Sequence, residues 1–144
     1  MGRKGIVMLD TRYQIFISTS GRDMQPERMV LSQTLVGMGF FAWGLEHRTP
    51  LTTTLARRQI DECDYVILLL GSQYGEQSIS GVSYLSLEYE YALSQAKPII
   101  VFMHEQPESR EIHLQETHPQ LKDKFLAFRK KLLLDVNHIF YFKT

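Results

Sequence analysis

Residues 60–75 read I-D-E-C-D-Y-V-I-L-L-L-G-S-Q-Y-G, and this stretch decides the fold. Its central run V-I-L-L-L is apolar without alternation, which is the pattern of a strand covered on both faces. The glycines of G-S-Q-Y-G predict a tight turn directly after that strand. A second run of the same kind, I-I-V-F-M, occupies residues 99–103. Two such strands predict a parallel sheet flanked by helices.

Working outward from these two strands, short β-branched or aromatic runs alternate with helical patterns. The five predicted strands are residues 13–18, 39–45, 65–71, 98–103 and 138–142, the last as an edge strand. Four helices are predicted. The first begins near residue 23 and ends at 37, the second follows Thr52–Thr54 and runs to about residue 62, and the last two span about 84–96 and 120–134. Pro26 suits the first turn of the first helix and Gly37 suits its C-terminal cap. Strand–helix alternation implies right-handed crossovers. The fold class is therefore α/β, a flavodoxin-like three-layer sandwich of about five parallel strands in the order 2-1-3-4-5.

The composition excludes several classes of protein. Sixteen Lys and Arg balance sixteen Asp and Glu in 144 residues, so the excess positive charge typical of nucleic-acid binders is absent. The longest apolar runs are too short to span a bilayer. Cys63 is the single cysteine, which excludes an intrachain disulfide and favours a reducing compartment. We therefore expect a cytoplasmic chain without nucleic-acid or membrane partners, with a single domain over residues 13–144 after an N-terminal extension over 1–12.

The fold predicts where a ligand binds, because open parallel sheets bind ligands beyond the carboxyl ends of their strands. The segments expected there are residues 18–21, 46–47, 71–75 and 104–105. No phosphate-binding P-loop and no Cys/His spacing typical of zinc occurs, so no metal site and no cofactor are expected. Cys63 precedes the third strand, at the opposite edge, and is interpreted as a buried structural thiol.

The helix over residues 84–96 carries two candidate carboxylates. At about 100° per residue, Leu85, Tyr89 and Ala92 form an apolar stripe together with Ala96. Glu88 falls on the flank of that stripe, whereas Glu90 points away from it. Helical geometry therefore favours Glu88 over Glu90 as the carboxylate that faces a partly buried cleft, where its pKa and hydrogen bonding are tuned by the surroundings. Periodicity alone leaves open the alternative that Glu88 is a surface glutamate near the start of the helix.

At this point the chain resembles a known family, the one catalogued as domain of unknown function 4062. The resemblance covers about residues 13–142 and rests on Y-Q-I-F-I-S-T-S-G-R-D-M-Q-P-E-R, the stretch at 60–75, G-V-S-Y-L-S-L-E-Y-E-Y-A-L and K-P-I-I-V-F-M-H. It implies a relation to Toll/interleukin-1 receptor (TIR) domains, whose aromatic–Glu–Ala pattern is matched by Tyr84, Glu88 and Ala92. It also implies roles in defence or in signalling proteins with NACHT-type and WD-repeat regions.

In catalytic TIR domains this glutamate is essential for cleaving the nicotinamide–ribose bond of NAD. The resemblance therefore implies Glu88 as the catalytic group and NAD, or a related nucleotide, as substrate. Nucleoside deoxyribosyltransferases, with a related fold and a glutamate nucleophile, offer a neighbouring reaction class. The predicted substrate-binding residues surround this glutamate and the two loops that follow the first and third strands: Ser18, Thr19, Ser20, Gly71, Tyr74, Gly75, Ser83 and Tyr84.

Two functions remain open from the sequence. One is a TIR-like effector or signalling domain, a hydrolase that cleaves the N-glycosidic bond of NAD or a related nucleotide. The other is a non-catalytic module that self-associates, binds a neighbouring domain or senses a nucleotide without cleaving it. Fold and one glutamate do not decide between them.

Overall fold

The computed structural model describes residues 13–143, and the predicted extension over residues 1–12 lies outside this range. The strands are β1 Gln14–Thr19, β2 Phe41–Trp43, β3 Tyr65–Leu70, β4 Ile99–His104 and β5 Ile139–Phe142. The helices are α2 Gln25–Gly37, α3 Thr53–Glu62, α4 Tyr84–Ser94 and α5 Pro119–Asp135. Short 3-10 turns occupy η1 Arg22–Met24, η2 Pro50–Thr52, η3 Pro107–Ser109 and η4 Ile112–Leu114.

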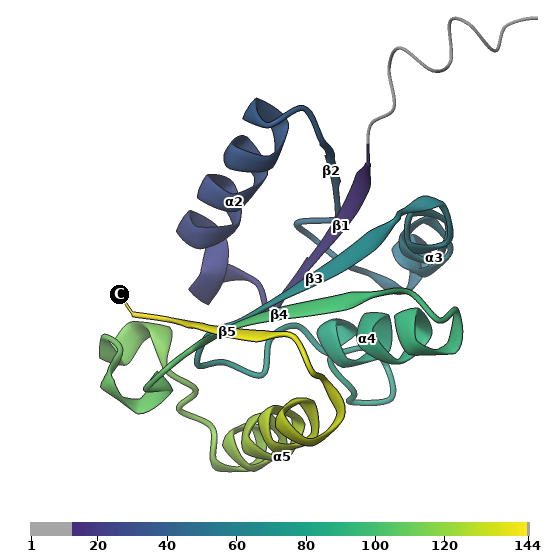
Figure 1. Cartoon of the computed structure of the whole chain (residues 1–144). Helices are drawn as coiled ribbons and strands as arrows, with labels where there is room; N and C mark the ends of the chain where they lie inside the picture. Colours follow the sequence, from purple (N-terminus) through teal and green to yellow (C-terminus); the bar gives the residue numbers. More distant parts are fainter. Residues whose placement is uncertain (1–12, 144) are drawn as a thin grey trace, which may run out of the picture.

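The five strands form one sheet in the order β2-β1-β3-β4-β5, and every neighbouring pair is parallel. This confirms the predicted flavodoxin-like order and places β5 at one edge of the sheet. Figure 1 shows α2 on one face of the sheet and α3, α4 and α5 on the other. The strand order reverses between β1 and β3, so this is the point where the fold favours a ligand.

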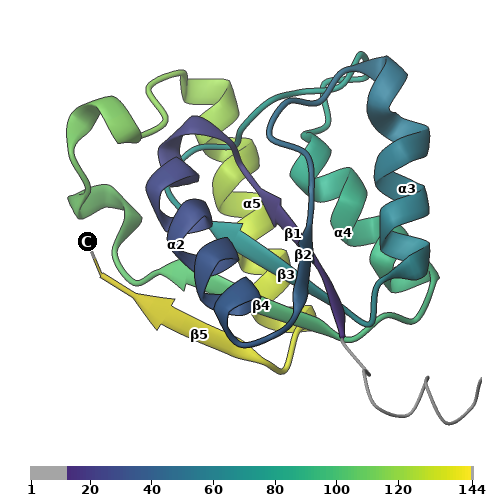
Figure 2. The ribbon, with the colours of Figure 1, turned by 90° about the horizontal axis from the view of Figure 1, so that it is seen from above.

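The sheet separates two apolar cores. Phe16 of β1 packs in the core under α3, α4 and α5, whereas Ile15 and Ile17 pack in the core under α2. Seen from above in Figure 2, α2 lies directly over the sheet. Because successive strand residues point to opposite faces, Ser18 follows Phe16 toward α4, and Thr19 follows Ile17 toward α2.

Two predicted helix ends differ from the structure. Gly37 is the last residue of α2 rather than its cap, and Gly39 takes the left-handed conformation with φ 94°. Helix α4 ends at Ser94, and Ala96, predicted to continue its apolar stripe, is exposed with φ 55°. The other stripe positions of α4 are buried as predicted.

The second strand is also shorter than predicted. Residues 39–45 were expected to be extended, but β2 comprises only Phe41–Trp43. It is an edge strand that pairs with β1 alone, through three residues. Gly44 ends it, because its φ of 134° departs from strand geometry.

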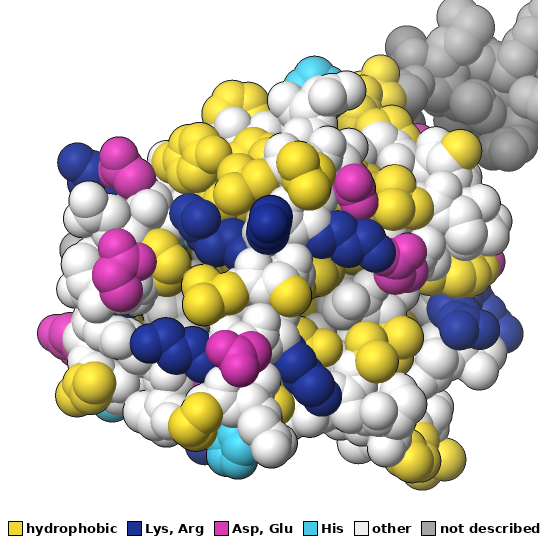
Figure 3. Space-filling model, turned by 90° about the horizontal axis from the view of Figure 1, so that it is seen from below, with side chains coloured by type: hydrophobic (Ala, Val, Ile, Leu, Met, Phe, Trp, Pro, Cys, Tyr) yellow, Lys and Arg dark blue, Asp and Glu magenta, His cyan; other side chains and the backbone are white. Residues whose placement is uncertain are grey.

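Charged side chains of both signs are interspersed on one side of the molecule. Figure 3 shows the side of α4 and α5, where Lys and Arg lie among acidic and hydrophobic side chains without forming one continuous patch. No helix among residues 13–143 is long and apolar enough to cross a membrane. Cys63 is buried, as predicted, and its Sγ donates a hydrogen bond to the carbonyl oxygen of Ile60 at 3.1 Å.

Candidate functional site

A cavity of about 670 Å³ opens at the carboxyl edge of the sheet, between the segments that follow β1, β2 and β3. Its wall includes Thr19 at the end of β1, Ser20 directly after it, Glu46 after β2 and Gly75 after β3. Helix α2 supplies a further side of the cavity. The volume falls within the range of about 300–1,000 Å³ that is typical of small-molecule sites. The cavity therefore lies where the strand order predicts a ligand.

The predicted glutamate lies beside this cavity, in a buried cluster of its own. Glu88 is 6% exposed and accepts a hydrogen bond from the Ser18 hydroxyl at 2.5 Å. Arg48 donates to both carboxylate oxygens, from Nε to Oε2 at 3.1 Å and from Nη2 to Oε1 at 2.9 Å. The prediction that Glu88 is buried is confirmed, and Glu90 is half exposed on an ion pair with Lys131.

Arg48 reaches Glu88 because the chain turns sharply after β2. Thr49 and Thr52 form reciprocal side-chain hydrogen bonds at the start of η2, which orders the entry to α3. Arg48 precedes this turn, is 5% exposed and also donates to the Ser18 hydroxyl at 3.4 Å. A bidentate guanidinium–carboxylate pair is strong and directional. The charge of Glu88 is therefore balanced inside the protein.

Glu88 and the large cavity occupy different sides of β1. Glu88, Arg48 and Tyr84 line a second cavity of about 30 Å³ between α3 and α4. That volume is about the space of one water molecule. Ser18 and Thr19 are adjacent in β1, and their side chains serve the two cavities separately, Ser18 through Glu88 and Thr19 in the wall of the large cavity.

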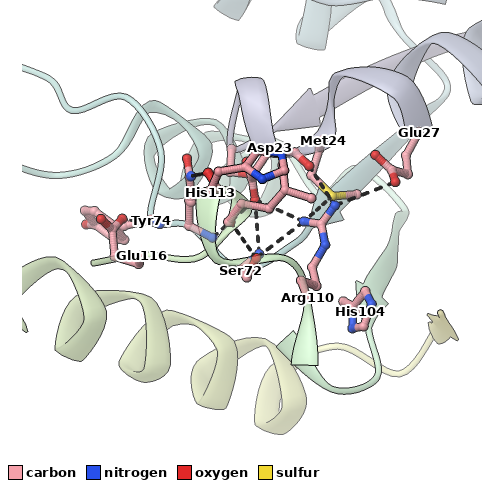
Figure 4. Close-up of polar contacts among 12 residues, drawn as sticks. Asp23, Met24, Glu27, Ser72, Tyr74, His104, Arg110, His113 and Glu116 are labelled. Carbon is pink, nitrogen blue, oxygen red and sulfur yellow. Dashed lines mark hydrogen bonds and ion pairs between the residues drawn. The ribbon is translucent and has the colours of Figure 1, made fainter. Parts of the chain in front are cut away.

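A second buried charge cluster holds the loops that frame the large cavity (Figure 4). Asp23 accepts hydrogen bonds from the Ser20 hydroxyl at 2.5 Å and from the backbone amides of Ser72 and Gln73 at 3.0 and 3.2 Å. Arg110 enters from the segment after β4, with Nη1 at 3.6 Å from Asp23 Oδ2. Burial raises the pKa of the Asp23 carboxyl, although these hydrogen bonds and Arg110 oppose the shift.

Two glycines are required by the close approach of these loops. A Cβ on Gly71 would collide with Arg110 and Asp23, and a Cβ on Gly75 would collide with the backbone of Ser20. Gly75 also has φ 90°, which favours glycine. The glycines predicted after the third strand therefore bring the β1 and β3 loops together.

The structure divides the predicted site residues into three groups. Thr19, Ser20 and Gly75 line the large cavity, and Tyr84 and Glu88 line the small one. The remaining four support the loops: Ser18 through Glu88, Gly71 against Arg110, and Tyr74 and Ser83 through a hydrogen bond of 3.1 Å from the Ser83 amide to the Tyr74 hydroxyl.

Internal hydrogen bonds occupy two positions near this edge. The N-terminal amides of α4 do not point freely at a ligand, because the Ser83 hydroxyl accepts from the Ser86 amide and the Tyr84 amide donates to the carbonyl of Glu76. His104 ends β4 at the carboxyl edge, as expected, but it is buried and its Nδ1 accepts a hydrogen bond from the Gln106 amide. Burial lowers the pKa of His104.

Sequence reasoning missed Arg48, Asp23 and Arg110 as parts of the site. A signal existed for Arg48, because it directly follows the segment 46–47 that was expected at the carboxyl edge. Arg110 gave no such signal, since it lies in the irregular segment between β4 and α5. Within the part of the chain that the structure describes, no group of three or more His, Cys, Asp or Glu side chains is arranged to hold a metal.

Comparisons with known proteins agree with this architecture. No curated protein matches the chain. The structure of the CMP N-glycosidase BcmB of Clostridium botulinum is similar, with a TM-score of 0.50 and 16% sequence identity. The match covers 91% of this chain and 88% of that one, and at this identity it shows a shared fold. The family described as "Domain of unknown function (DUF4062)" matches residues 14–144, so the chain belongs to the DUF4062 family.

Proposed function

We propose that this domain cleaves the N-glycosidic bond of a nucleotide, with Glu88 as the carboxylate that acts at the ribose. The observation that carries the proposal is the burial of Glu88 at the carboxyl edge of the sheet, on the hydroxyl of Ser18. A carboxylate in this setting is ordered by its neighbours and shielded from solvent, two conditions that strengthen its electrostatic effect on a substrate.

The chemistry needs one well-placed carboxylate. As the bond between C1′ and the base breaks, the base leaves with the bonding electrons and positive charge develops on the ribose. The Glu88 carboxylate stabilises that charge, and a water molecule then adds its hydroxide to C1′ and releases a proton. The pyridinium ring of NAD leaves as neutral nicotinamide, whereas the base of CMP needs one proton, which is balanced by the proton that the attacking water gives up.

The comparisons support the choice of substrates to test. The Clostridium botulinum protein of similar fold is described as a CMP N-glycosidase, so CMP joins NAD as a candidate. The pattern of Tyr84, Glu88 and Ala92 supports a relation to TIR domains. We propose on this basis a cytoplasmic effector or signalling role, in defence or alongside NACHT-type and WD-repeat regions.

The arrangement sets a condition on turnover. Arg48 occupies both oxygens of Glu88, so a ribose must displace Arg48 before its C1′ can approach the carboxylate. Arg48 belongs to the loop between β2 and α3, which makes that loop the element that opens. Displaced from Glu88, the guanidinium becomes available to an anionic group of the substrate.

The test incubates wild type and variants with NAD, CMP and other nucleotides and measures the released base by chromatography. Glu88→Gln is expected to abolish release. Glu88→Asp keeps the charge but moves the carboxylate away from the substrate, and its rate of base release is expected to fall about 100-fold. Glu90→Gln on the same helix is the matched control and is expected to retain wild-type activity. Circular dichroism verifies that each variant folds, and equal activity of wild type and Glu88→Asp would refute the role of Glu88.

A specific observation also favours a second candidate, a non-catalytic assembly or nucleotide-sensing module. Glu88 is fully paired in a cavity of about 30 Å³, which suits a structural ion pair. This candidate predicts no base release at any protein concentration, together with self-association or nucleotide binding. Sedimentation across a concentration series, with and without NAD, tests it: a strict monomer that binds no nucleotide would exclude it.

A further inference from the structure

Arg28 of α2 is the most deeply placed cation in the wall of the large cavity. Its side chain is 15% exposed, and Nη1 lies 3.5 Å from Glu46 Oε1. Among the residues that the structure describes, its buried Nε–H meets no hydrogen-bond acceptor. A guanidinium stays protonated at neutral pH. Arg28 therefore brings a full positive charge to the wall of a cavity of ligand size.

The backbone makes room for this guanidinium. A Cβ on Gly44 would collide with Arg28 Nη2 and with the carbonyl oxygen of Ile17. Gly44 has φ 134°, a conformation that side-chain-bearing residues rarely adopt. The glycine that ends β2 thus lets Arg28 lie against the strand ends, beside the cavity wall.

Glu46 is a weak partner for Arg28. Its side chain is 68% exposed, and an ion pair with one partner in solvent contributes little to stability. A phosphate offers better geometry, because its oxygens accept two parallel hydrogen bonds from one guanidinium. A phosphate entering the cavity can therefore replace Glu46 on Arg28 at small cost.

We propose that Arg28 binds the phosphate of a nucleoside 5′-monophosphate in the large cavity, displacing Glu46. Thr19 lies in the same wall. This inference rests on the proposed function, since it names the class of substrate and an anion contact for it in the large cavity, on the other side of β1 from Glu88. It assigns to Arg28 a role that the family resemblance does not provide.

The charge balance of the cavity selects a monophosphate over a triphosphate. The wall carries two permanent cations, Arg22 and Arg28, against three carboxylates, Glu46, Glu76 and Glu116. Such a wall offers no excess positive charge to offset three phosphate groups. One phosphate on Arg28 leaves the carboxylates Glu76 and Glu116 to accept hydrogen bonds from amino or hydroxyl groups of the nucleoside.

The test measures binding by isothermal titration calorimetry with the full chain. The ligands are AMP, CMP, GMP and UMP, the four matching nucleosides, ATP and inorganic phosphate. At least one monophosphate is expected to bind about 10-fold or more tightly than its nucleoside, because a hydrogen bond to a charged group adds an appreciable part of the affinity. The same monophosphate should bind more tightly than both ATP and inorganic phosphate.

Variants identify the residue. Arg28→Gln is expected to lower monophosphate affinity about 10- to 100-fold and leave nucleoside affinity unchanged. Arg28→Lys keeps the charge but loses the planar guanidinium group, so its monophosphate affinity should lie between those of wild type and Arg28→Gln. Glu46→Gln removes the competing carboxylate and should raise monophosphate affinity about two- to five-fold. Arg58→Gln, an exposed arginine of α3 outside the cavity, is the matched control.

Three results would each overturn the inference: no monophosphate binds better than its nucleoside, Arg28→Gln binds like wild type, or inorganic phosphate or ATP binds as tightly as the monophosphate. The proposed function fails separately. If the chain binds a monophosphate through Arg28 but releases no base, only the proposed cleavage by Glu88 is refuted and the role of Arg28 stands. If the chain cleaves nucleotides but its affinity for them does not depend on Arg28, only the inference about Arg28 is refuted and the proposed function stands.

Discussion

The Arg48–Glu88 pair permits a quantitative prediction about stability. Each side chain is at least nine-tenths buried, and the two are joined by two hydrogen bonds of 2.9 and 3.1 Å. Removing one partner leaves the other charge buried and unpaired, which costs about 3–5 kcal/mol. We therefore expect Arg48→Met and Glu88→Met each to lower the free energy of unfolding by about this amount.

The double variant should be much less destabilised than the sum of the two. Arg48→Met/Glu88→Met places unbranched apolar side chains where both charges stood, and such replacements are often neutral. Ser18 loses its acceptor, which costs about 1–3 kcal/mol. The coupling free energy is then about 3 kcal/mol or more, at or above the top of the range for contacting residues.

Urea unfolding followed by far-ultraviolet circular dichroism measures all four corners of this cycle. The control cycle uses Glu90→Gln and Lys131→Met on the exposed pair between α4 and α5, where a coupling below about 1 kcal/mol is expected. Additive effects of the Arg48 and Glu88 variants would refute the reasoning, because they would mean that neither charge depends on the other for its burial.

Three further predictions concern the loops, the buried histidine and the cysteine. Gly75→Ala should lower the free energy of unfolding by about 2 kcal/mol or more, through its φ of 90° and the collision with the neighbouring loop. Gly37 of α2 has open space around it, so Gly37→Ala should raise the free energy of unfolding by about 0.5–1 kcal/mol. Equal effects of the two substitutions in urea unfolding would contradict the specific need for glycine at position 75. Because burial places the pKa of His104 below its ordinary 6.5, the unfolded chain binds more protons between the two values. The free energy of unfolding should therefore fall as pH decreases through 6.5 toward the folded pKa, and the slope should flatten in His104→Asn; an unchanged slope in urea titrations would exclude His104 as its cause. Burial also raises the pKa of Cys63. Its reaction with an aromatic disulfide should be at least about 100-fold slower in the native than in the urea-unfolded chain, and a fast native reaction would show that the thiol is accessible.

The fold could be predicted because its elements follow local periodicity. The apolar runs of β3 and β4 and the alternation of strands with helices are visible in consecutive residues, and they led to the observed strand order. The ends of elements were less predictable. Gly39 and Gly44 adopt positive φ, and α2 and β2 end differently from the simplest interpretation of the sequence.

The candidate site shows the same contrast. Helix geometry indicated that Glu88 rather than Glu90 lies beside the apolar stripe of α4, and the structure shows that Glu88 is buried. Arg48 could not be found in this way, because it lies 40 positions from Glu88 in a loop without periodicity. Arg110 reaches the backbone carbonyl of Asp23 from 87 positions away at 2.8 Å. Pairings of this kind become visible only when the chain is folded.

The alternation of side chains in β1 has a practical consequence for engineering this domain. Ser18 and Thr19 are consecutive, yet one contacts the buried glutamate and the other lines the ligand-sized cavity. Substitutions at position 19 can therefore reshape ligand selectivity without touching the ion pair, and substitutions at position 18 can tune the glutamate without altering the cavity wall. Two consecutive residues can therefore be substituted independently, one to change ligand recognition and the other to change the environment of Glu88.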